Sequence, residues 1–211
     1  MKHSSDRILT THVGSLPRPT DVMDFLVAKE SGEPYDSAGF DTCMRRAVHD
    51  VVAEQVALGI DVVSDGEASK PGYATYVKDR LTGFSGDSPP IHFADLEGFP
   101  KYRVRMGQAA GARPVVRARC MGPVAVRDTL QLEADLENFR DAVDAAEAGE
   151  GFLNAASPGV IAIFQSNDYY PSHDAYLAAL AAAMKEEYNA VVRAGFLLQV
   201  DCPDLAMGRH V

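Results

Sequence analysis

One arrangement of residues occurs twice in this chain of 211 residues and constrains its fold more than any other feature. A helical pattern ends at a glycine, and a short apolar run follows it and ends on an acidic residue. The first copy runs from Ala47 through Gly59 to Glu67, and the second passes Gly195 and ends with the run Phe196–Asp201. Buried parallel strands have continuous apolar residues, and the residue just after a helix often needs a positive φ, which glycine allows. The repeat therefore predicts an α/β fold built on a parallel sheet.

The two acids that end these runs, Glu67 and Asp201, are the first candidates for a binding site. The carboxyl ends of parallel strands lie at one edge of a sheet, and ligands of α/β proteins bind there. We therefore expect both carboxylates on the same rim. The alternative is a structural role, either as helix caps or as ion-pair partners of Arg18 or Arg119.

The number of strand–helix units leaves the architecture open at this point. The pattern gives about four or five such units, whereas a (β/α)8 barrel has eight strands and typically about 250 residues. The chain is therefore either a small doubly wound fold or a barrel without its last part. Residues 88–107 hold two β-rich stretches around a Gly/Pro turn and predict an excursion hairpin. Arg113–Cys120 is expected to be the next strand of the core.

The charge balance and the chain's apolar pattern exclude several classes of partner. The formal net charge is -10 and the sequence pI is about 5.0, which disfavours a nucleic-acid surface and an anionic membrane surface. The first residues, Met1–Arg7, lack the apolar segment of a signal peptide. No run approaches the roughly 20 apolar residues that a membrane span needs. The sequence predicts a cytoplasmic protein with no nucleic acid and no membrane among its partners.

The few cysteines argue against a disulfide framework and give only a weak metal signal. Cys43, Cys120 and Cys202 form an odd, sparse set, and Cys43 falls in a helical pattern, where it is expected in the core. His12, Cys120 and Cys202 together have the chemistry of a zinc set. They lack the short ligand spacing that such sites show, so we expect no metal site from these three residues.

Five motifs in order along the chain resemble one enzyme family. They are the stretches Thr10–Arg18, Val62–Glu67, Cys120–Pro123, Asn167–Asp168 and Gln199–Pro203. Each motif is weak by itself, but the ordered set is similar to the catalytic domain of cobalamin-independent methionine synthase. The similarity is greatest to the shorter branch of that family, which lacks the N-terminal duplicate domain.

The resemblance implies a TIM barrel, with residues 1–211 as a single partial domain covering about the first half to two-thirds of it. The implied reaction transfers a methyl group to the thiol of homocysteine and makes methionine. The implied cofactor is zinc, with ligands on strands expected beyond residue 211. The implied methyl donor is 5-methyltetrahydrofolate, although the chain has no Trp for that family's donor platform. The implied partners are therefore homocysteine and the donor.

The resemblance also assigns roles to residues, but it assigns no catalytic residue. Gly14 and Ser15 would hold the carboxylate of the amino acid, and Glu67 and Asp201 would hold its ammonium group. The candidates for donor binding are Asn167, Asp168 and Tyr169. The alternative for Ser15, Asn167 and Asp168 is a plain turn-forming role.

Other functions remain open beside methionine synthesis. A related zinc-dependent alkyl or coenzyme M transferase, or a decarboxylase on the same barrel, would use the same fold. An inactive truncated domain without the zinc half of the site is the non-enzyme alternative. Open sheet edges in a partial barrel would favour association, so a homo-oligomer is among the expected states of the chain.

Overall fold

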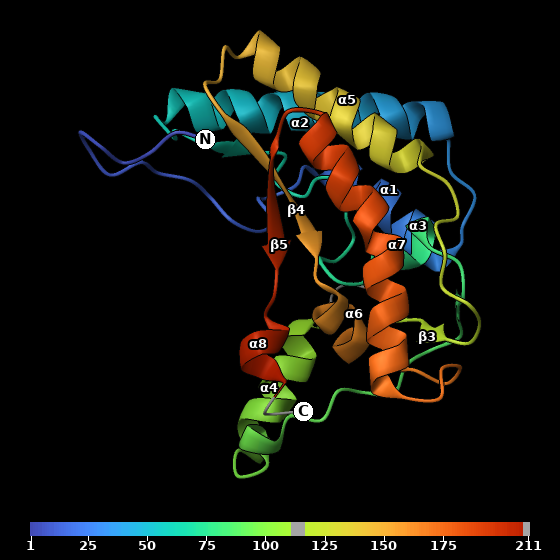
Figure 1. The fold of residues 1–211 in the computed structure, drawn as a ribbon. Coiled ribbons are helices and arrows are strands. Elements are labelled where there is room, and N and C mark those ends of the chain that lie inside the picture. The colour runs from blue at the N-terminus through green and yellow to red at the C-terminus, as the bar shows by residue number, and fades with distance from the viewer. Residues whose placement is uncertain (111–116, 209–211) are drawn as a thin grey trace. The chain divides into compact units, whose positions relative to one another are not determined.

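The parallel α/β fold expected from the sequence is present in the computed structural model, which describes residues 1–110 and 117–208 (Figure 1). The elements in chain order are α1 (Thr20–Ser31), α2 (Ser37–Ala57), β1 (Val63–Ser64), α3 (Val77–Arg80), β2 (Phe84–Ser85), the 3-10 helix η1 (Ala94–Leu96), α4 (Pro100–Ala110), β3 (Arg119–Cys120), α5 (Leu130–Ala145), β4 (Gly151–Ala156), α6 (Pro158–Phe164), α7 (His173–Arg193), β5 (Leu197–Asp201) and α8 (Asp204–Met207). Among the described residues, no helix has the length and apolar character that crossing a membrane requires.

The chain folds into two compact units, each built from separate segments. The first unit consists of Met1–Tyr73, Asp128–Ala155 and Lys185–Val200. The second consists of Ala74–Arg127, Ala156–Met184 and Asp201–Val211. The first unit contains Glu67 and the parallel sheet except for Ala156 and Asp201, the last residues of β4 and β5. The second unit contains the Asn167 loop, residues 165–172 between α6 and α7.

The parallel sheet has three strands in the order β1-β4-β5. β1 pairs with β4 in parallel, with Val63 opposite Gly151 and Ser64 opposite Phe152. β5 runs beside β4 in the same direction (Figure 1). A parallel bridge between Thr11 and Val62 brings the chain's first segment beside β1. The parallel sheet that the repeated helix–strand arrangement predicts is therefore confirmed.

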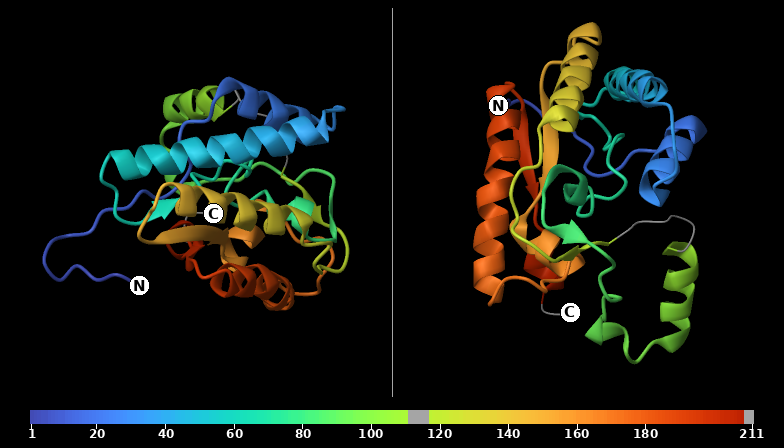
Figure 2. Two further views of the ribbon diagram at one scale, coloured as in Figure 1. Left: turned by 90° about the horizontal axis from the view of Figure 1, so that it is seen from above. Right: turned by 90° about the vertical axis from the view of Figure 1, so that its right-hand side faces the viewer.

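The main core of the first unit lies between the sheet and helices α2, α5 and α7. α2 and α5 lie side by side in both views of Figure 2. Their apolar faces meet the strands because the buried residues recur at helical spacing. The buried members of this core are Val48, Val52, Val63, Ala68, Phe139, Ala142, Leu153 and Val191. A smaller cluster between α1 and α2 includes Cys43, so the expectation that this cysteine lies in the core is confirmed.

A glutamine of α2 completes the hydrogen bonding of β1. The buried Gln55 side chain donates to the carbonyl of Ser64 at 2.8 Å and accepts from the amide of Ser64 at 3.0 Å. The side-chain amide thus pairs with the strand end as a neighbouring strand would. It fixes the backbone one residue before Asp65, where the chain leaves the sheet.

Two expectations for the middle of the chain are wrong. Residues 88–107 do not form a hairpin, because the described chain there forms η1 and then α4. Pro100 begins α4, and proline suits the first helical position because its φ is already helical and its missing N–H is not needed there. β3 pairs antiparallel with β2, with Phe84 opposite Cys120, and so is not a strand of the parallel sheet. Residues 113–116 of the expected strand lie outside the described residues.

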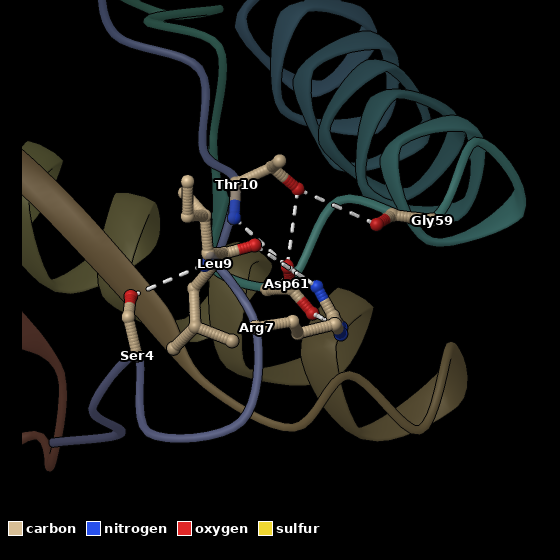
Figure 3. Close-up of polar contacts among 7 residues, drawn as sticks. Ser4, Arg7, Leu9, Thr10, Gly59 and Asp61 are labelled. Atoms are coloured by element: carbon tan, nitrogen blue, oxygen red, sulfur yellow. Dashed lines mark hydrogen bonds and ion pairs between the residues drawn. The ribbon is translucent and has the colours of Figure 1, made fainter.

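The N-terminal segment is tied to the start of β1 by one carboxylate, as Figure 3 shows. The guanidinium of Arg7 binds both oxygens of Asp61. Asp61 Oδ2 also accepts from the amide of Thr10 at 2.8 Å and from its hydroxyl at 3.1 Å. The hydrogen bonds from Arg7, followed by those from Thr10, hold the pKa of Asp61 well below its usual range. The pairing thereby sets the position of Thr11 beside Val62.

Replacing Asp61 with asparagine is expected to lower stability in a pH-dependent way. The folded pKa is depressed, so the carboxylate's contribution is present above the ordinary value of about 4 and is lost as pH falls toward the folded value. Urea midpoints should therefore differ between wild type and Asp61→Asn at pH 7, and the difference should shrink below about pH 4. Asp24→Asn, at an exposed position of α1, is the control. A difference that stays constant down to pH 2.5 would contradict the prediction.

Candidate functional site

The candidate site begins with a strained turn at the carboxyl end of β1. Gly66 and Glu67 both have left-handed backbones, with φ of 62° and 56°. Glycine adopts this conformation freely, but for a residue with a side chain it costs about 1–2 kcal/mol. The side chain of Asp65 stabilises the turn by accepting from the Glu67 amide at 3.0 Å. Strained residues of this kind cluster at ligand sites, and here the strain is at the predicted binding acid.

The Glu67 carboxylate is buried and is held by a donor on each oxygen. Ser15 Oγ donates to Oε2 at 2.5 Å, and Asn154 Nδ2 donates to Oε1 at 2.5 Å. Glu67 is only 3% exposed. A buried carboxylate is costly unless it is hydrogen-bonded, and these two donors supply that compensation. The structure therefore brings together two of the residues singled out in the sequence, Ser15 and Glu67.

Arg18 shapes the same loop through main-chain oxygens. Its Nη2 donates to the carbonyl of Glu67 at 2.7 Å and to the carbonyl of Lys70 at 2.8 Å. It also lies 3.3 Å from Ser15 Oγ. These bonds fasten the Gly14–Arg18 segment to the turn after β1. Gly14 itself has φ of 92°, and a Cβ added there would meet no atom within 4 Å, so the backbone at this point is open to an approaching group.

A buried lysine lies on the other side of Asn154. Lys70 is 3% exposed and Asn154 is 5% exposed. Lys70 Nζ donates to the main-chain carbonyl of Asn154 at 2.5 Å and to its side-chain Oδ1 at 3.3 Å. Asn154 sits within β4, all of whose residues are buried. The amide therefore links a buried ammonium group with a buried carboxylate.

Asp201 lies where the sequence predicts, as the last residue of β5. Its carbonyl accepts from the amide of Ser157, the N-cap residue of α6. Asp201 belongs to the second unit and Glu67 to the first. The grouping of the two acids on one ligand therefore stays a prediction.

The Asn167 loop of the second unit confirms the turn-forming alternative for Asn167. Its Oδ1 accepts from the amides of Tyr169 at 3.2 Å and Tyr170 at 2.8 Å, and its Nδ2 donates to the carbonyl of Tyr170 at 2.8 Å. Asp168 accepts from Arg119 Nη1 at 2.8 Å. Tyr169 is 51% exposed, so its ring is available for stacking. The donor-binding role of Asn167, Asp168 and Tyr169 stays a prediction.

The cysteine and histidine side chains do not form a described metal centre. In the described ranges, no group of three or more His, Cys, Asp or Glu side chains is arranged to hold a metal ion. Burial raises the pKa of the Cys120 thiol, which donates to the carbonyl of Gly122 at 3.4 Å. Metals bind the thiolate, so a raised thiol pKa weakens metal binding at this position.

Two residues of the site, Lys70 and Asn154, were not singled out in the sequence. A signal for Asn154 exists, because it is a lone amide inside the apolar run Phe152–Ala156. A polar residue in a fully buried strand must find partners, so it marks a point where chemistry or a side-chain network is located. Lys70 has no comparable signal, since a lysine in a loop is ordinarily solvated.

A cavity of about 420 Å³ lies elsewhere in the first unit, near the amino ends of the strands. Its lining includes Glu150 and Phe152, at the start of β4, and Leu197, at the start of β5. Glu150 accepts from the main-chain amide of Lys2 at 2.9 Å and pairs with the N-terminal ammonium at 3.2 Å. Because ligands of α/β sheets bind at the carboxyl ends of strands, the group of residues around Glu67 is the stronger candidate.

The fold is the α/β fold seen in vitamin-B12-independent methionine synthases. A B12-independent methionine synthase from Shewanella sp. W3-18-1, solved in complex with selenomethionine, superposes with a TM-score of 0.67 at 20% identity. The alignment covers 92% of this chain and 51% of that chain. A putative vitamin-B12-independent methionine synthase from Listeria monocytogenes gives a TM-score of 0.62 at 17% identity, covering 92% of this chain and 53% of that one.

Sequence comparison identifies the same relatives. Residues 8–91 match the family described as cobalamin-independent synthase, catalytic domain. A 5-methyltetrahydropteroyltriglutamate–homocysteine methyltransferase from Neisseria meningitidis strain FAM18 is 28% identical over 133 residues, which is 56% of this chain and 17% of the relative. The corresponding protein of Burkholderia mallei strain SAVP1 is 26% identical over 182 residues, which is 72% of this chain and 23% of the relative.

These matches confirm the resemblance to cobalamin-independent methionine synthase that the five motifs predict. The matched residues 8–91 include Gly14, Ser15 and Glu67. The chain spans less than a quarter of the length of these two named sequence relatives and about half of the two solved chains.

Proposed function

We propose that this chain carries the amino-acid pocket of a methyltransferase that methylates the thiol of homocysteine. In that reaction an S–CH3 bond forms, the bond between the methyl group and its donor breaks, and the thiol proton passes to the donor. The matched relatives are named for this transfer, from a 5-methyltetrahydropteroyltriglutamate donor. The sheet would then be the first part of a (β/α)8 barrel, with β1, β4 and β5 among its strands.

The observation that supports this function best is the buried Glu67 carboxylate with Ser15 on one of its oxygens. A carboxylate in a low-dielectric pocket attracts a cation more strongly than it would in water. The ammonium of an amino acid would bind Glu67 Oε2 and displace the Ser15 hydroxyl from it. That hydroxyl and the Gly14 main chain would then bind the carboxylate of the ligand.

Zinc is implied by the family resemblance, and it would lower the pKa of the homocysteine thiol when bound. The described residues do not fit it, because they contain no group of three or more His, Cys, Asp or Glu side chains that could hold a metal ion. We therefore assign no zinc ligand to the described residues and no step of the reaction to the metal.

The donor would be 5-methyltetrahydrofolate or its polyglutamate form. Tyr169 would stack on the pterin ring, since it is half exposed, and Asp168 with Asn167 would fix the loop that carries it. Aromatic stacking of this kind contributes on the order of 1 kcal/mol. The donor assignment is independent of the Glu67 pocket, so the two can be tested separately.

Isothermal titration calorimetry with a set of matched ligands tests the amino-acid pocket. L-Homocysteine and L-methionine are expected to bind, because both carry the ammonium and the carboxylate. N-Acetyl-L-methionine lacks the cation and coenzyme M lacks both groups, so both are expected to bind at least tenfold more weakly, a loss of about 1.4 kcal/mol. The same contrast separates homocysteine from coenzyme M as the acceptor.

Two results would argue against this function. Equal binding of L-methionine and N-acetyl-L-methionine would show that no carboxylate recognises the ammonium group. Preferential binding of coenzyme M would favour the related alkyl transferases. Binding of L-methionine without methyl transfer by the isolated chain would fit an inactive domain that keeps the pocket.

A further inference from the structure

We propose that Asn154, with its amide oriented by Lys70, is a positioning residue that fixes the Glu67 carboxylate for a ligand's ammonium group. This inference rests on the proposed function, because it concerns how the same pocket is prepared for its ligand. The three residues come from two places in the chain: Glu67 and Lys70 from the loop after β1, and Asn154 from the middle of β4.

The orientation of the Asn154 amide follows from the donors and acceptors around it. A lysine ammonium group has three donors and no acceptor, so it selects the carbonyl oxygen of a neighbouring amide. Lys70 Nζ lies 3.3 Å from Asn154 Oδ1 and 2.5 Å from the main-chain oxygen of the same residue. The side-chain NH2 group must therefore face the opposite way, toward Glu67.

In that orientation, the side chain of Asn154 faces Glu67 as a hydrogen-bond donor. Asn154 Nδ2 lies 2.5 Å from Glu67 Oε1. A hydrogen bond donated to a carboxylate is stronger than one between neutral groups. One oxygen of Glu67 is thus permanently occupied, and the second oxygen, now bound by Ser15, is the one left for an incoming cation.

The rigidity of the arrangement comes from its burial and its place on a strand. Lys70, Asn154 and Glu67 are each at most 5% exposed. Sites built on strands keep their geometry better than sites built on loops, because neighbouring strands hold the strand backbone in place. Glu67 lies on a strained turn, so its side chain depends on a partner from β4 to keep one position.

A double-mutant cycle on ligand affinity tests the proposal. Asn154→Leu removes the donor with a side chain of similar size, and Lys70→Met removes the cation that orients it. Each is expected to weaken L-methionine binding by about tenfold, the effect of losing one hydrogen bond of about 1.4 kcal/mol to a charged group. In a Glu67→Gln background, Asn154→Leu should cause less than a threefold further loss, because there is no carboxylate left to position. Lys70→Arg, which keeps the cation, should restore part of the affinity.

The control is Lys29→Met, which removes a lysine of α1 that bonds the side chain of Gln131. It should leave the affinity for L-methionine within twofold of wild type. Circular dichroism and a thermal midpoint would establish that each variant is folded. If Asn154→Leu does not fold, Asn154→Ser takes its place in the cycle, since serine is smaller and keeps a polar group at the position.

The outcomes separate this inference from the function on which it rests. If wild-type chain binds no L-methionine, the proposed function fails and the inference fails with it. If wild type binds but Asn154→Leu and Lys70→Met bind equally well, the function stands and the positioning role is wrong. If Asn154→Leu weakens L-methionine binding by the same factor in the wild-type and Glu67→Gln backgrounds, its effect is a general structural one. That result would also overturn the inference.

Discussion

The Glu67→Gln variant is expected to bind L-methionine roughly two orders of magnitude more weakly than wild type, because removing one partner of a buried charge pair costs about 2–5 kcal/mol. The substitution keeps the size of the side chain. Its amide oxygen can still accept from Asn154, and its NH2 group can donate to Ser15, which as a hydroxyl can accept as well as donate. The fold should therefore survive while the negative charge is lost.

Calorimetric titration of both proteins with L-methionine measures this effect. Glu54→Gln is the matched control, since Glu54 lies on the exposed face of α2 in the same unit. It should bind the ligand as wild type does. A Glu67→Gln protein that binds within threefold of wild type would mean that Glu67 is a structural acid at the strand end.

The Phe139→Ala variant is expected to lose about 3–5 kcal/mol of unfolding free energy, the range for a fully buried phenylalanine. Phe139 lies on α5 and is 0% exposed. Its ring packs against Phe196, with ring centroids 4.7 Å apart, and a Cβ added to Gly151 would lie only 2.8 Å from it. The ring therefore fills the space between α5 and the beginning of β4, and β4 carries Asn154 into the site.

Urea unfolding followed by circular dichroism measures this loss. Leu130→Ala on the same helix is the control, because Leu130 is 73% exposed and its substitution should change stability by less than about 0.5 kcal/mol. A loss below about 1 kcal/mol for Phe139→Ala would show that the neighbouring side chains collapse into the space or that this core contributes little.

The sequence predicts the repeated helix–glycine–strand arrangement well because each part has a local cause. Gly59 and Gly195 have φ of 78° and 86°, values that favour glycine whatever surrounds them. The apolar runs that follow them need burial, and the acids at their ends cannot stay inside the sheet. Glu67 and Asp201 could therefore be placed at strand ends without knowledge of tertiary contacts.

Errors in the prediction arose where two local patterns competed. The stretch Tyr102–Met106 alternates apolar and charged residues as a strand does, but Pro100 before it is a helix start, and the helix prevails. The helix α6, which Ser157 caps by accepting from the amide of Val160, is not among the elements that the sequence predicts.

The partners of Glu67 depend on contacts that no local pattern contains. Asn154 is 87 residues away in the chain from Glu67, and Ser15 is 52 residues away. Only the pairing of β1 with β4, and of the first segment with β1, brings them together. The resemblance to the enzyme family indicated Ser15, because a family motif reflects the three-dimensional site of its members. Neither the resemblance nor the residue spacing indicated Lys70 or Asn154.

A crystal structure of the chain grown with selenomethionine as ligand would show directly whether the residues around Glu67 bind an amino acid. The anomalous signal of selenium locates the ligand independently of the protein phases. One strong selenium peak is expected beside the turn after β1, with the ligand's ammonium on Glu67 and its carboxylate at Ser15 and Gly14. A selenium peak at another place, or an empty pocket with Ser15 still bonded to Glu67 at millimolar ligand, would contradict it.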